Sequence, residues 1–177
     1  IKASKLDSPS TTAGVIGRMA LEVLLFRSLF RNVKLDYREG PKITYYWEKW
    51  LWLAGLLFHY SFLVIVIRHV RFFVEPIPSL VQMISTVDGF FQITVPTIFL
   101  TDIAFLGAVT YLFLRRVFIP GVRYISLPAD FFPLFLILGI GVSGVLMRNV
   151  WKVDLLSVKE LAMGLFTFHP AVPQGIG

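Results

Sequence analysis

The sequence predicts an all-α fold, a polytopic bundle of membrane helices. Of its 177 residues, 56% are hydrophobic and only 16% are charged, whereas charged residues make up roughly 25% of an ordinary soluble protein. A soluble domain of this size still exposes about a third of the surface of its unfolded chain, so it could not hide so many apolar side chains. Three apolar stretches, each near the ~20 residues that span hydrocarbon as a helix, predict three transmembrane helices. Two amphipathic stretches predict two additional surface helices.

The three expected transmembrane helices differ in the polar or small residues that they carry. The first covers residues 50–67, with His59 as its only strongly polar member, and aromatic side chains gather at its start, as is usual near lipid headgroups: Tyr45, Tyr46, Trp47, Trp50 and Trp52. The second covers residues 93–114 and is interrupted mainly by Asp102. The third covers residues 131–147. Its glycines allow close approach of a neighbouring helix or a flat ligand: Gly139, Gly141 and Gly144.

Two surface helices are expected to flank the spans. Residues 13–33 are rich in Leu, Val and Phe but carry four charged side chains, so this helix should lie at the membrane surface or dock a soluble partner. Residues 155–168 place their apolar side chains on one arc, which predicts the second surface helix. We therefore expect a cytoplasmic segment over 1–49, a three-span membrane domain over 50–147, and an extracytoplasmic segment over 148–177 that leads to later helices absent from this chain.

Positive charge predicts the orientation. Lys and Arg total 17 against 11 Asp and Glu, a net charge of +6. With the amino end in the cytoplasm, twelve of the basic residues lie inside and five outside, as the positive-inside rule requires. We expect a multi-pass protein of the inner (cytoplasmic) membrane. The basic balance then reflects membrane orientation and a docking face, and no nucleic acid partner is expected.

Several chemistries are excluded for this chain. Cysteine is absent, which excludes disulfides, thiolate metal sites and a cysteine nucleophile within it. The sequence contains no phosphate-binding loop, dinucleotide fingerprint or His-Glu-x-x-His motif. No catalytic residue is predicted, so any enzymatic activity would belong to a larger complex.

His59 and His69 are the strongest functional signal. They lie ten residues apart on one expected helix, which separates them by about 15 Å along the axis and turns the side chain by about 80°. Neutral imidazole is a common axial ligand of haem iron, so the pair is typical of two haems at different depths in the membrane. The alternative is that each histidine only hydrogen-bonds a neighbour or meets headgroup water.

The third histidine does not complete this set. Two haems that are each held by two imidazoles need four, and the sequence has three. His169 precedes Pro170, and a residue before proline disfavours the helical conformation, so we expect His169 in a loop. The missing ligands are expected in sequence that is not present here.

Other polar residues near the histidines each have two interpretations. Arg68 and Arg71 flank His69 and could pair with haem propionates or extend to lipid headgroups. Asp102 lies within the second span and must be paired, hydrogen-bonded or protonated; a structural bond to a neighbouring helix is favoured over a proton route. An aromatic pocket beside His69 could take a quinone ring, with the candidates Phe72, Phe73, Asp88, Phe90 and Phe91.

The two stretches that carry the histidines also resemble a known family. Residues 58–62 (Phe-His-Tyr-Ser-Phe) and 67–72 (Ile-Arg-His-Val-Arg-Phe) resemble the second helix of the respiratory nitrate reductase gamma subunit family. Residues 123–130, 158–161 and 167–170 are similar to one branch of it, the cytochrome b subunits of the Dsr (dissimilatory sulfite reduction-associated) transmembrane complex of sulfate-reducing organisms. The resemblance covers nearly the whole chain.

The resemblance implies a function as well as a fold. Such subunits have five or six membrane helices and two b haems, and they exchange electrons between menaquinone and a cytoplasmic, heterodisulfide-reductase-like iron–sulfur subunit. It implies that His59 ligates the haem nearer the cytoplasm and His69 the outer haem, with the remaining two ligands on a later helix. A periplasmic multihaem cytochrome c and further membrane subunits are implied as partners. Quinone-site residues do not transfer, because residues 72–114 contain no lysine.

Two alternatives remain. The same scaffold could serve a nitrate reductase or a heterodisulfide reductase complex. The chain could also be a haem-free membrane anchor or transporter.

Overall fold

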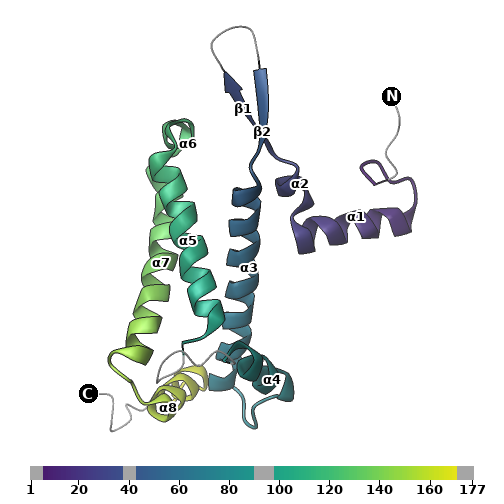
Figure 1. Ribbon diagram of the computed structural model, residues 1–177. Helices are drawn as coiled ribbons and strands as arrows, with labels where there is room; N and C mark the ends of the chain where they lie inside the picture. Colours follow the sequence, from purple (N-terminus) through teal and green to yellow (C-terminus); the bar gives the residue numbers. More distant parts are fainter. Residues whose placement is uncertain (1–5, 38–42, 90–97, 171–177) are drawn as a thin grey trace. The chain divides into compact units, whose positions relative to one another are not determined.

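The computed structural model describes residues 6–37, 43–89 and 98–170 (Figure 1). The chain divides into an amino-terminal unit, residues 1–56, and a carboxy-terminal unit, residues 57–177. Within the described residues the structure is mainly helical, as predicted, but it also contains one short β-hairpin where the sequence pattern indicated none.

The amino-terminal unit begins with two helices instead of the single helix predicted over 13–33. Helix α1 (Thr12–Leu25) starts at Thr11, whose hydroxyl oxygen accepts a hydrogen bond from the Gly14 amide at 3.2 Å. It ends at Phe26, which adopts a left-handed conformation with φ 48° and ψ 48°. Helix α2 (Arg27–Phe30) follows.

Side-chain contacts explain the break at Phe26. The Glu22 carboxylate accepts hydrogen bonds from the Ser28 amide at 2.8 Å and from its hydroxyl at 2.6 Å. The Trp52 indole donates to the carbonyl oxygen of Leu25 at 2.7 Å. These contacts satisfy backbone groups that the ends of the two helices leave open.

The hairpin consists of β1 (Val33–Tyr37) and β2 (Ile43–Trp47), which pair antiparallel with Val33 opposite Trp47. Helix α3 (Lys49–His69) starts two residues later and continues into a short 3₁₀ turn, η1 (Val70–Phe72). The first predicted span therefore corresponds to α3, which extends a little beyond residues 50–67 at both ends.

In its described part, the carboxy-terminal unit continues from α3 into five helices: α4 (Ser79–Asp88), α5 (Leu100–Phe118), α6 (Pro120–Ile125), α7 (Pro128–Asn149) and α8 (Leu155–Phe166). Helices α5 and α7 lie side by side and α8 contacts η1 (Figure 1). The predicted third span and second surface helix correspond to α7 and α8.

The core of this unit centres on α5. Phe105, Ala108 and Val109 are buried at i, i+3 and i+4 spacing, which places them on one face of the helix. The Phe105 ring stacks at 5.7 Å from that of Phe58 and at 6.0 Å from that of Phe62, both on α3. One aromatic ring thus joins α5 to the helix that carries His59.

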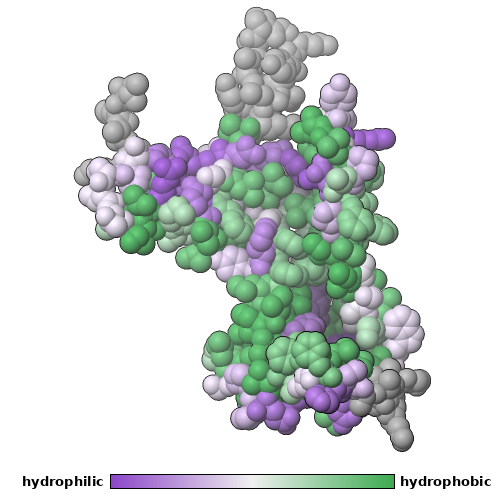
Figure 2. Space-filling view, turned by 180° about the vertical axis from the view of Figure 1, so that it is seen from behind, coloured by the Kyte–Doolittle hydropathy of each residue, from purple (hydrophilic) through white to green (hydrophobic). Residues whose placement is uncertain are grey.

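Two helices of the described chain are long and apolar enough to cross a membrane, Lys49–Phe72 and Pro128–Asn149. The expected second span, residues 93–114, begins outside the described residues, and its part from residue 100 onward lies in α5, so its crossing stays a prediction. Much of the apolar surface of the helices is exposed, and Figure 2 shows it as a broad hydrophobic region that gives way to hydrophilic side chains at the lower end.

Candidate functional site

Both candidate ligands project from α3 and are exposed. The uninterrupted apolar composition of α3 favours a continuous helix, so the ten-residue spacing between His59 and His69 is preserved. His59 lies in the middle of the helix, with its ring 4.9 Å from that of Phe58 in an edge-to-face arrangement. His69 is the last residue of the helix, and its ring lies 5.8 Å from that of Phe72.

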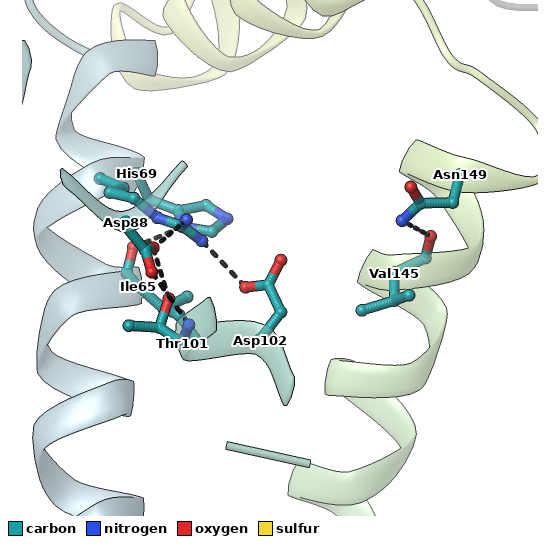
Figure 3. Close-up of polar contacts among 8 residues, drawn as sticks. Ile65, His69, Asp88, Thr101, Asp102, Val145 and Asn149 are labelled. Carbon is teal, nitrogen blue, oxygen red and sulfur yellow. Dashed lines mark hydrogen bonds and ion pairs between the residues drawn. The ribbon is translucent and has the colours of Figure 1, made fainter. Parts of the chain in front are cut away.

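The hydrogen bond of His69 determines which ring nitrogen can ligate a metal. Its Nδ1 lies 2.7 Å from the carbonyl oxygen of Ile65, one turn earlier on α3 (Figure 3). A carbonyl oxygen can only accept a hydrogen bond, so Nδ1 carries the proton and Nε2 of the neutral ring keeps its lone pair. Histidines that ligate metals usually donate their other ring N–H to such a carbonyl, which fixes the tautomer and orients the ring.

Arg68, the neighbour of His69, is buried in a polar cluster. Its guanidinium donates to the Asp102 carboxylate on α5 at 2.9 Å and also to Asp88 at the end of α4. The backbone N–H and hydroxyl of Thr101 donate to Asp88 as well, at 2.9 and 2.6 Å. Figure 3 shows Asp88, Thr101 and Asp102 gathered beside the end of α3 that carries His69. We call Arg68, Asp88, Thr101 and Asp102 the Arg68 cluster.

Aromatic contacts extend the Arg68 cluster to α7. The Arg68 guanidinium carbon lies 3.7 Å from the centre of the buried Phe99 ring, and the guanidinium carbon of Arg148 on α7 lies 4.0 Å from it. Two cations on one ring gain attraction from its electron-rich faces. The end of α3 beside His69 is therefore linked to α4, α5 and α7.

The predicted propionate-binding and quinone-binding residues do not lie in one common site. The Arg68 side chain is held by two carboxylates, whereas Arg71 lies over the Phe72 ring at 5.3 Å. Phe73 packs against Phe166 of α8, with ring centres 5.9 Å apart. Phe72 lies beside His69, whereas Asp88 belongs to the Arg68 cluster. Phe90 and Phe91 lie outside the described residues.

The glycines of α7 divide into two kinds. A Cβ at Gly141 would come within 2.7 Å of the Phe105 ring and 2.9 Å of Leu106, so this glycine permits the close contact with α5. Cβ atoms at Gly139 and Gly144 would meet nothing within 4 Å. His169 bonds through Nδ1 to the carbonyl oxygen of Thr167 at 2.8 Å, beyond the end of α8 and outside any helix.

The residues present fit axial ligation of haem iron. In the described ranges no three His, Asp or Glu side chains form a group that could hold a bare metal ion. Haem needs no such group from the protein, since the porphyrin supplies four nitrogens and a single imidazole supplies an axial ligand. The exposed His69, with its tautomer set by Ile65, meets this requirement.

Sequence reasoning anticipated the need for a partner at Asp102 but missed the identity of that partner. A carboxylate in an apolar span signals a nearby donor, yet the donor lies 34 residues earlier in the sequence. The role of Phe99 between two arginines had no signal in the sequence pattern.

Fold and site together define a helical protein of the membrane type that carries two exposed imidazoles on one apolar helix. The chain belongs to the nitrate reductase gamma subunit family, whose family model matches residues 14–174. It is 43% identical over 167 residues to the Hdr-like menaquinol oxidoreductase cytochrome b-like subunit of Archaeoglobus fulgidus, covering 93% of this chain and 49% of that protein. The protein of the same name from Archaeoglobus profundus is 42% identical over 171 residues, covering 96% of this chain and 50% of that protein.

The chain therefore spans about half the length of the curated relatives that it matches. No solved structure matches it significantly.

Proposed function

We propose that this chain is the part of a membrane diheme cytochrome b subunit that carries one axial histidine for each haem, His59 and His69. The tautomer of His69, set by the Ile65 carbonyl, is the observation that carries the proposal. Each imidazole would bind iron through Nε2, and the apolar surface of α3 would exclude water from both sites. Bound haem b would supply a one-electron redox couple.

The subunit would pass electrons between menaquinone or menaquinol and a cytoplasmic iron–sulfur subunit of the heterodisulfide-reductase type. The printed names of the Archaeoglobus relatives, which combine "Hdr-like", "menaquinol oxidoreductase" and "cytochrome b-like", support this. The iron–sulfur subunit would dock on the basic residues of segment 1–49, and menaquinone would bind near Phe72 and His69 on the opposite side. The protein would be a multi-pass protein of the inner membrane, with α3, α5 and α7 as its three spans here.

Within this class we propose the DsrM subunit of the Dsr complex of sulfur metabolism, also written DsrMKJOP. Its further partners would be a periplasmic multihaem cytochrome c and additional membrane subunits. The alternative is the same scaffold in a nitrate reductase or heterodisulfide reductase complex. Purification of the intact complex under mild conditions, with identification of its subunits, distinguishes them: a multihaem cytochrome c beside the iron–sulfur subunit supports the Dsr assignment, and its absence contradicts it.

A redox difference spectrum of the full-length protein in membranes tests the haem assignment. The native protein should show two b haems with separate midpoint potentials. His59→Ala and His69→Ala should each remove one of the two, whereas His169→Ala, the matched control, should keep both because His169 lies in a loop. A spectrum without b haem would support the haem-free anchor or transporter. Two haems that persist in both α3 variants would refute the ligand assignment.

A further inference from the structure

An apolar stripe on α1 faces away from the rest of the amino-terminal unit. Ile16, Met19 and Val23 follow one another at i, i+3 and i+7 and are 65%, 57% and 64% exposed, and α1 has no buried residue. Figure 2 shows hydrophobic side chains on the lower side of α1 and hydrophilic ones on its upper side. Such a stripe on a soluble surface would be unfavourable, so it needs a covering.

The opposite side of α1 is occupied by polar contacts. Asp7 accepts from Arg27 at 2.7 Å and from Arg31 at 2.6 Å, and its backbone carbonyl accepts from Arg18. Glu22 is bonded to Ser28. Among the described residues, these interactions engage Arg18 and Glu22 of α1, which leaves the apolar stripe as the face for an outside partner.

Contacts within the amino-terminal unit fix the end of α1 at the aromatic belt of α3. The indole N–H of Trp52 donates to the Leu25 carbonyl, and the Phe30 ring lies 4.9 Å from that of Trp52. Trp47 and Trp50 beside them are 58% and 72% exposed. Tryptophan with one apolar and one polar side concentrates where hydrocarbon meets headgroups. This belt therefore sets the depth at which α1 lies.

The direction of α1 makes lipid a better covering than another spanning helix. Within the amino-terminal unit, Figure 1 shows α1 extending sideways from the first turns of α3 (residues 49–56) and not along them. A further spanning helix beside α3 would cross α1 and cover about 10 Å of it, the diameter of a helix, whereas 14 residues of α1 extend about 21 Å. Much of the stripe would still be uncovered by protein.

We propose that α1 is an interfacial helix that lies in the headgroup layer at the amino end of α3, with Ile16, Met19 and Val23 against the acyl chains. The basic residues that follow its carboxy-terminal end, Arg27 and Arg31, favour a leaflet that carries anionic lipid. The inference rests on the proposed membrane location of α3 but not on haem binding.

Site-directed spin labelling of the full-length protein in liposomes that contain anionic lipid tests the proposal. This stretch has no cysteine; any cysteine elsewhere in the full-length chain is first replaced by serine. Labels are attached to Ile16→Cys and Val23→Cys on the stripe and to Ser8→Cys as the matched control, since the exposed Ser8 lines a hollow together with Arg18 and Glu22 that neither Ile16 nor Val23 enters. Collisions with oxygen, which concentrates in lipid, are compared with collisions with a water-soluble nickel chelate.

The stripe labels should give an oxygen-to-nickel collision ratio several-fold higher than the Ser8→Cys label. Stripe labels that are immobile and shielded from both reagents would overturn the proposal, because a protein segment would then cover the stripe. A ratio as low as that of Ser8→Cys would overturn it as well, because the stripe would then face water. A haem spectrum recorded on the same samples separates this result from that of the proposed function, since neither label touches His59 or His69.

Discussion

The guanidinium of Arg68 on α3 donates to the carboxylate of Asp102 on α5 at 2.9 Å, across 34 residues of sequence. The same guanidinium also pairs with Asp88. The side chains of Arg68, Asp102 and Asp88 are only 8%, 16% and 5% exposed, respectively. The negative charge of a carboxylate removed from water in this way is compensated by the cation that lies between the two carboxylates. The Arg68 cluster therefore holds three helices together at the point where His69 ends α3.

Loss of Arg68 should destabilise the protein strongly. Arg68→Ala leaves Asp88 and Asp102 buried without their cation, which is expected to cost about 3–5 kcal/mol of unfolding free energy, as when one partner of a buried pair is removed. Thermal unfolding of the purified full-length protein in detergent measures this loss. Arg123→Ala is the matched control, because Arg123 is exposed and should change stability by no more than about 0.5 kcal/mol.

Asp102→Asn removes the ion pair of Arg68 with Asp102 and tests it apart from the ion pair with Asp88. Arg68 keeps its ion pair with Asp88 in this variant, so the loss should be smaller than that of Arg68→Ala. The combination of Arg68→Ala with Asp102→Asn should cost less than the sum of the two single changes, since the residues share one interaction. Equal stability of Arg68→Ala and Arg123→Ala would contradict this role of the cluster.

The sequence predicted α3, α7 and α8 to within a few residues, because each has a continuous or periodic apolar pattern that depends on local residues alone. It did not predict the break at Phe26, which depends on Trp52 and on the Glu22–Ser28 contact. The aromatic residues before Trp47 were assigned to a headgroup belt, which hid the strand β2. For the site, the pattern identified both histidines and the cost of burying Asp102, but the Arg68 cluster joins residues that only the folded chain brings together.

Gly141 should tolerate a methyl group poorly. A Cβ there would lie 2.7 Å from the Phe105 ring, and Phe105 cannot move easily because it is buried and stacks on Phe58 and Phe62. Gly141→Ala should therefore destabilise the protein by about 1–3 kcal/mol, the usual cost of overpacking. Thermal unfolding of the full-length protein gives the value.

Gly139→Ala is the matched control for Gly141→Ala. It lies on the same helix, and a Cβ there meets nothing within 4 Å. Replacing glycine by alanine within a helix favours the helix by up to about 1 kcal/mol, so Gly139→Ala should be neutral or stabilising. If both substitutions change stability in the same direction, the α5–α7 contact is not limited by space at Gly141.

The stability of α8 should depend on pH through Asp154, the residue that caps its amino end. Its carboxylate accepts hydrogen bonds from the Ser157 amide at 3.0 Å, from the Ser157 hydroxyl at 2.8 Å and from the Leu156 amide at 3.3 Å. The bonds from Ser157 hold the pKa of Asp154 below its ordinary value. A depressed pKa in the folded state means that the contribution is fully present above the pKa of the unfolded chain and is lost as the pH falls through the folded pKa.

Asp154→Asn keeps a capping oxygen but removes the charge. Amide hydrogen exchange across α8 should therefore show more protection in the native chain than in this variant at neutral pH, and the difference should disappear in acid. Comparison of the two proteins at the same pH cancels the intrinsic pH dependence of exchange. Glu160→Gln removes an exposed carboxylate from the same helix and should give no such pH-dependent difference. In acid the carboxylate of Asp154 is protonated and can no longer act as the anionic acceptor at the amino end of α8. A difference between native protein and Asp154→Asn that persists or grows in acid would therefore show that the charge of Asp154 does not stabilise the helix.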